Sequence, residues 1–97
     1  SSVIRSINTT YQDIVNDRIL ADSSGSGFTI TLPASPSSGD EVRFLDVTAS
    51  FDTNHLTIGR NSQKINGNSA DLTVATESAG FSLVYYNSTY GWRYTEA

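Results

Sequence analysis

Residues 28–32 alternate strictly between apolar and hydroxylated side chains, and this pattern limits the fold more than any other feature. Every second residue is apolar, and the two between them are Thr29 and Thr31. An extended strand places the apolar side chains on one face and the threonines on the other. A proline and a Ser- and Gly-rich connection follow, and the pattern restarts at Val42. We interpret residues 22–47 as a hairpin-like unit of an antiparallel sheet.

Similar short segments recur along the chain, separated by turn residues such as Ser-Gly-Ser-Gly at 24–27 and Asn-Gly-Asn at 66–68. Strands are expected at 3–7, 12–15, 18–22, 28–32, 41–47, 55–59, 64–65, 71–75, 81–86 and 91–95. Such spacing predicts an all-β fold, an antiparallel β-sandwich or a jelly-roll-like barrel of about 8–10 short strands. No internal repeat indicates a solenoid or a propeller.

Two segments allow alternative readings. Residues 11–20 have near-helical apolar spacing, but the β-branched residues and the Asn16-Asp17 pair favour two short strands around a turn. Residues 81–86 are apolar or aromatic on both faces towards their C-terminal end. We expect this strand to be either central under a loop or part of a subunit interface.

Length, composition and charge limit the domain organisation, the kinds of partner and the sources of stability. The 97 residues suit one domain, with residues 1–9 as a lead-in, and the lack of an initiator Met suggests a piece of a longer polypeptide or a processed chain. The net charge is −4 and the basic residues are scattered, which argues against nucleic acid. No apolar run approaches the roughly 20 residues of a membrane span. Cysteine is absent, so extra stability must come from packing or from oligomerisation.

No pattern of reactive residues predicts catalysis, a metal or a cofactor. His55 is the only histidine, and no Gly-x-Ser-x-Gly motif accompanies it. Asp13, Asp17 and Asp22 form no calcium-binding signature. The Ser-Gly-Ser-Gly segment lacks the Lys-Ser/Thr that a phosphate-binding loop requires. We therefore expect no catalytic, metal-binding or cofactor-binding residues.

Aromatic residues gather near the C-terminus and are the remaining candidates for a site. The cluster consists of Tyr85, Tyr86, Tyr90, Trp92 and Tyr94. Exposed rings among amides and hydroxyls could stack on sugars, whereas rings on one strand face are typical of core or interface packing. The candidate residues for glycan binding or for an interface are Tyr86, Tyr90 and Trp92.

Several segments resemble a small β-domain that recurs in structural proteins of tailed bacteriophages, cyanophage fibres above all. The most specific are TLPASPSSGD at 31–40 and NHLTIGRN at 54–61. Residues 17–22, 64–67, 81–85 and 91–92 agree with them, so that the resemblance covers roughly residues 10–94.

This resemblance implies a virion appendage: a tail fibre, a tail spike, or a capsid fibre or knob. It implies a homotrimer that contacts other virion proteins and a host surface, with a host glycan as the candidate ligand there, and it supplies no catalytic motif. We expect a non-enzymatic structural or adhesive module, with a carbohydrate-binding module as the alternative and a polysaccharide depolymerase fragment as the less favoured one.

Overall fold

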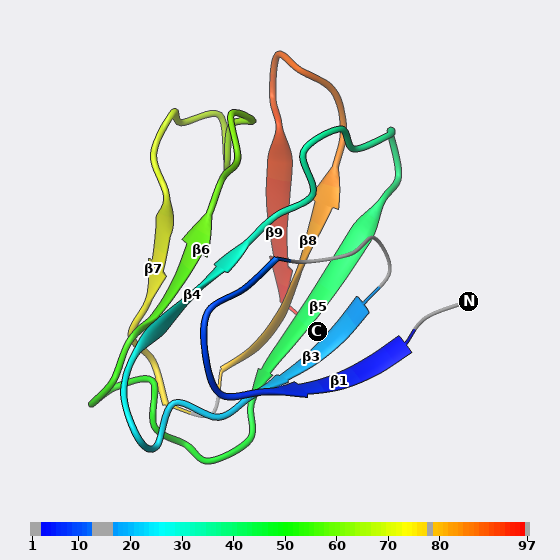
Figure 1. Cartoon of the computed structure of the whole chain (residues 1–97). Helices are drawn as coiled ribbons and strands as arrows, with labels where there is room; N and C mark the ends of the chain where they lie inside the picture. Colours follow the sequence, from blue (N-terminus) through cyan, green and yellow to red (C-terminus); the bar gives the residue numbers. More distant parts are fainter. Residues whose placement is uncertain (1–2, 13–16, 78, 97) are drawn as a thin grey trace.

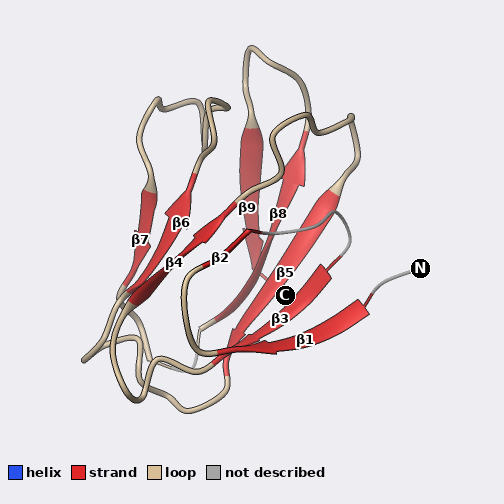
Figure 2. Ribbon diagram, viewed as in Figure 1, coloured by secondary structure: helices blue, strands red, loops and turns tan. Residues whose placement is uncertain are grey.

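Two β-sheets pack face to face in the computed structural model, which describes residues 3–12, 17–77 and 79–96 (Figures 1 and 2). The larger sheet has the order β1 (Val3–Ile7), β3 (Asp17–Ala21), β5 (Glu41–Asp46), β8 (Gly80–Tyr85) and β9 (Trp92–Glu96). The smaller sheet has the order β2 (Tyr11–Gln12), β4 (Phe28–Thr31), β6 (Leu56–Gly59) and β7 (Leu72–Val74). The predicted all-β sandwich is confirmed. Among the described residues, no helix is long and apolar enough to cross a membrane.

The chain alternates between the two sheets from β1 to β6, so that it winds through three stacked coils (Figure 1). Consequently β1, β3 and β5 are parallel neighbours, as are β2, β4 and β6. The expectation of antiparallel pairing holds only for β5–β8, β6–β7 and β8–β9. The proposed hairpin at 22–47 is wrong, because β4 and β5 belong to different sheets and cannot pair.

Unequal coil lengths explain why the sequence shows no repeat. Val3 pairs with Asp17, 14 residues further along, whereas Arg18 pairs with Arg43, 25 residues further along. A search for a fixed period fails when successive coils differ this much, although each coil contributes the same two strands. Backbone bonds continue the stacking beyond the strands, since the amide of Asp22 donates to Ile7 and that of Val47 donates to Ala21.

The N-terminal part of the chain differs from the prediction in two details. Asp17 begins β3 instead of completing a turn with Asn16, and β2 lies in the sheet opposite β3. The remainder of the expected strand at 12–15, residues 13–15, lies outside the described residues. Within the expected lead-in at 1–9, β1 is an edge strand of the larger sheet.

The core lies between the sheets and is built from the inward residues of each strand, as the alternation at 28–32 predicts. The buried apolar side chains are Ile19, Ala21, Phe28, Ile30, Leu32, Val42, Phe44, Phe51, Leu56, Ile58, Ile65, Val74, Phe81, Leu83, Tyr85 and Trp92. Phe81 stacks on Phe44 with ring centroids 5.0 Å apart and on Tyr94 at 5.2 Å. These stacked rings tie β5, β8 and β9 together across the sheet.

Short carboxylate side chains hold the turns at the end of the sandwich where β5 finishes. The buried carboxylate of Asp46 accepts hydrogen bonds from the amides of Ser50 at 3.0 Å and Phe51 at 2.9 Å, which fixes the turn that inserts Phe51 into the core. Asp22 accepts from the hydroxyl and the amide of Ser24. These bonds lower the pKa of Asp22 below its ordinary value, so its turn keeps them until the pH falls through that depressed pKa.

A segment of the β6–β7 connection, residues 64–67, crosses to the larger sheet and closes the sandwich along β9. The amide of Trp92 donates to the Lys64 carbonyl at 2.7 Å, and the amide of Asn66 donates to the Trp92 carbonyl at 2.7 Å. Gly91 lies against this segment with a positive φ of 72°. A Cβ at this position would lie 2.0 Å from the Lys64 carbonyl oxygen, so only glycine fits.

We therefore expect Gly91→Ala to lower the free energy of unfolding by more than about 2 kcal/mol, because the side chain would push residues 64–67 away from β9. Urea denaturation measures this change. Gly25→Ala is the matched control, since nothing lies within 4 Å of its added Cβ. Equal stabilities of the two variants would contradict the close approach.

Candidate functional site

Two exposed tyrosines stack on one another where β8 turns into β9. The rings of Tyr86 and Tyr90 have centroids 5.8 Å apart and are inclined by 30°. Their exposed fractions are 57% and 52%, which are among the highest of the large apolar or aromatic side chains in the described part of the chain. The β8–β9 connection that carries the pair lies at the end of the sandwich opposite the turns that follow β3 and β5 (Figure 1).

The loop that carries these tyrosines is held by its own side chains. The Asn87 side-chain oxygen accepts hydrogen bonds from the amides of Thr89 and Tyr90, both at 3.0 Å. The Gly91 amide donates to the Asn87 carbonyl at 2.7 Å, and the Tyr86 amide donates to the Gly91 carbonyl at 3.1 Å. A surface held in this way loses little conformational entropy when a ligand binds, so the tyrosine pair is suited to recognition.

Trp92, selected with Tyr86 and Tyr90 as a candidate for glycan binding or for an interface, does not belong to the exposed set. Its side chain is fully buried and packs edge-on against Tyr85, with centroids 5.4 Å apart. The Tyr85 hydroxyl donates to Gln63 at 2.9 Å. Tyr94 covers Phe81 and is 40% exposed. The aromatic cluster thus divides into two core rings, one partly exposed ring and the exposed Tyr86–Tyr90 pair.

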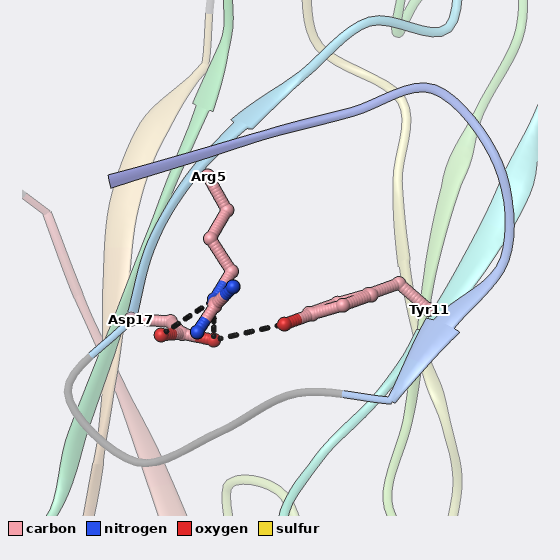
Figure 3. Close-up of polar contacts among 3 residues, drawn as sticks. All are labelled: Arg5, Tyr11 and Asp17. Atoms are coloured by element: carbon pink, nitrogen blue, oxygen red, sulfur yellow. Dashed lines mark hydrogen bonds and ion pairs between the residues drawn. The ribbon is translucent and has the colours of Figure 1, made fainter. Parts of the chain in front are cut away.

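A cluster of polar side chains lies between the two sheets at their β1 and β2 edges (Figure 3). The carboxylate of Asp17 is only 1% exposed, and the Arg5 Nε donates to both of its oxygens at 3.1 Å. The Tyr11 hydroxyl donates to one of them at 3.4 Å. The three residues come from β3, β1 and β2, so the cluster bridges the larger and the smaller sheet.

This cluster satisfies a buried charge. The Asp17 carboxylate is neutralised by the Arg5 guanidinium. Buried charges require such partners, and the pair closes an edge of the sandwich that apolar residues leave open. The sequence analysis did not predict this ion pair. It could have been predicted, because Arg5 and Asp17 occupy the inward phase of two strands and carry opposite charges.

His55, Asp17 and Asp22 take part in structural hydrogen bonds. His55 Nδ1 lies 2.7 Å from the Phe51 carbonyl, which can only accept, so this nitrogen carries the proton and the ring supports the turn. Of the three aspartates weighed as metal ligands, Asp17 and Asp22 are separate hydrogen-bonded groups and Asp13 lies outside the described residues. No group of three metal-binding side chains occurs in the described part of the chain.

No protein-family model matches this chain, and no curated protein matches it.

Removing one partner of the buried ion pair should destabilise the fold more than removing the other. Arg5→Met keeps the aliphatic stem but leaves the Asp17 carboxylate buried without its guanidinium, whereas Asp17→Asn leaves a neutral amide and an Arg5 side chain that is already 36% exposed. We expect Arg5→Met to lower the free energy of unfolding by about 2 kcal/mol and Asp17→Asn by less. Tyr11→Phe should cost under about 1 kcal/mol. Chemical denaturation of the three variants checks this order, and the reverse order would contradict it.

Proposed function

We propose that this chain is a non-enzymatic structural and adhesive module of a bacteriophage particle, a domain of a tail fibre or capsid fibre that assembles as a homotrimer. The observation that carries the proposal is the contrast between polar side chains that are bound within the fold and aromatic side chains that are exposed. The described carboxylates of Asp17, Asp22 and Asp46 and the His55 ring are bound into the framework, while the Tyr86–Tyr90 pair is left exposed on a held loop. The resemblance of residues 31–40 and 54–61 to phage appendage domains supports the same assignment.

The edge of the larger sheet at β1 supports the homotrimer. Among the described strands, β1 has a hydrogen-bonded neighbour on one side only, so its outer backbone groups can pair with another chain, whereas residues 64–67 already occupy part of the β9 edge. A three-fold ring needs a head-to-tail contact between two different surfaces, and the β1 edge supplies one of them. Ile4 on β1 is 61% exposed and adds apolar area at this edge.

The homotrimer predicts the effect of a charge at the β1 edge. Ile4→Lys should convert the trimer to a monomer without loss of fold, because an exposed edge lysine opposes strand pairing between chains. Val47→Lys is the control, since Val47 is 44% exposed but lies beyond the end of β5. Light scattering coupled to size exclusion gives the masses. A monomeric parent at micromolar concentration would contradict the trimer, and a trimeric Ile4→Lys would contradict the β1 contact.

The exposed tyrosine pair favours a second candidate, a carbohydrate-binding module, which is compatible with a fibre tip that contacts host glycans. Flat aromatic surfaces bind rings by stacking, and we take the scale of base–aromatic stacking as a guide. Tyr86→Ala and Tyr90→Ala should each weaken glycan binding by about 1–3 kcal/mol.

Calorimetry with glycans from the host envelope measures this loss. Tyr86→Phe keeps the ring and should bind like the parent chain. Alanine variants that keep full affinity would exclude the tyrosine pair as the glycan site, and variants that lose the fold would assign the rings to packing.

A further inference from the structure

Two arginines lie opposite one another on the outer face of the larger sheet. Arg18 on β3 pairs in register with Arg43 on β5, and both point away from the core. Neighbouring strands are only about 4.8 Å apart, and like charges at this spacing repel. Arg43 has one exposed ion pair, with Glu41 at 3.5 Å. No ion pair is described for Arg18, so the positive charge on this face is not fully neutralised.

A hollow of about 200 Å³ is lined by both of these arginines. Gly80 pairs with Leu45 on the neighbouring strand and has no side chain to fill this space. Leu20 and Leu45 supply apolar walls, and Leu45 is 42% exposed. The hollow therefore combines two cationic groups with an apolar surface, open to solvent on the outer face of the sheet.

The charge of this face is opposite to that of the whole chain. Three of the six basic residues, Arg18, Arg43 and Arg93, lie on it, and Glu41 is the one acidic side chain described there. The net charge of the chain is −4. At physiological ionic strength charges interact over about 8 Å, so a ligand at the hollow responds to the arginines more than to distant carboxylates.

We propose that the hollow between Arg18, Arg43 and Gly80 binds an acidic polysaccharide through the carboxylate of a uronic acid residue. A planar carboxylate matches the forked donors of a guanidinium, and two guanidinium groups in register can grip both of its oxygens. The apolar face of the sugar ring then packs on Leu20 and Leu45. The Glu41–Arg43 pair is exposed and contributes little, so the ligand carboxylate can replace Glu41. This site lies on a sheet face, apart from the Tyr86–Tyr90 loop, and does not depend on the proposed function.

The test measures binding of oligogalacturonate by calorimetry, with dextran sulfate and neutral dextran as comparison probes. Arg18→Ala and Arg43→Ala should each weaken oligogalacturonate binding by about tenfold or more, because each removes a charge-assisted bond. Arg18→Lys keeps the charge but loses the forked geometry, and should bind more weakly than the parent. Gly80→Ala should narrow the hollow and also weaken binding, while the fold remains, because the added Cβ meets only the Leu45 side chain, at 3.5 Å.

Arg60→Ala is the matched control, since it removes the same unit of charge from the β6–β7 connection and should leave the affinity within about twofold. Tyr86→Ala should also bind normally, which separates this site from the tyrosine pair. Equal losses in Arg18→Ala and Arg60→Ala would overturn the proposal in favour of general electrostatics. Binding of dextran sulfate alone, or of neutral dextran equally well, would overturn the uronate assignment. A change of oligomeric mass in Arg18→Ala without a loss of affinity would show that the face is an interface between copies.

Discussion

Parallel neighbours within a sheet cannot be joined by a tight turn, and this constraint shapes the whole molecule. β1, β3 and β5 are parallel neighbours, so the chain must travel back between them, and it does so through β2, β4 and β6 in the opposite sheet. Every one of these connections therefore crosses the end of the sandwich. The turns held by Asp22 and Asp46, and the insertion of Phe51 into the core, are consequences of these crossings.

Closure of the sandwich uses different chemistry on its two sides. Along β9, residues 64–67 form backbone hydrogen bonds with the strand, and Gly91 permits the close approach. Along β1 and β2, the Arg5–Asp17–Tyr11 cluster connects the sheets through side chains. The first side depends on a missing Cβ and the second on charge neutralisation. The backbone edge of β1 stays open for contacts with another chain, whereas residues 64–67 occupy part of the β9 edge.

Both proposals concern surfaces that the framework leaves exposed. The framework uses the Asp17, Asp22 and Asp46 carboxylates and the His55 ring in hydrogen bonds. Two kinds of surface among those left exposed are an aromatic pair on a held loop and an arginine face with a hollow above Gly80. Both kinds suit recognition of extended polar ligands such as glycans, one by stacking and the other by charge.

The sequence by itself determined the all-β class, most strand positions and the inward residues, because alternation of side chains along a strand is a local property. The predicted strands at 3–7, 28–32 and 41–47 match β1, β4 and β5 closely. The tertiary structure alone decided which strands pair, since pairing depends on chain crossings whose lengths vary from coil to coil. It also decided that Trp92 is buried while Tyr86 and Tyr90 are exposed, and that Arg18 meets Arg43. These facts depend on register between strands that are distant in the sequence, and no local pattern contains that register.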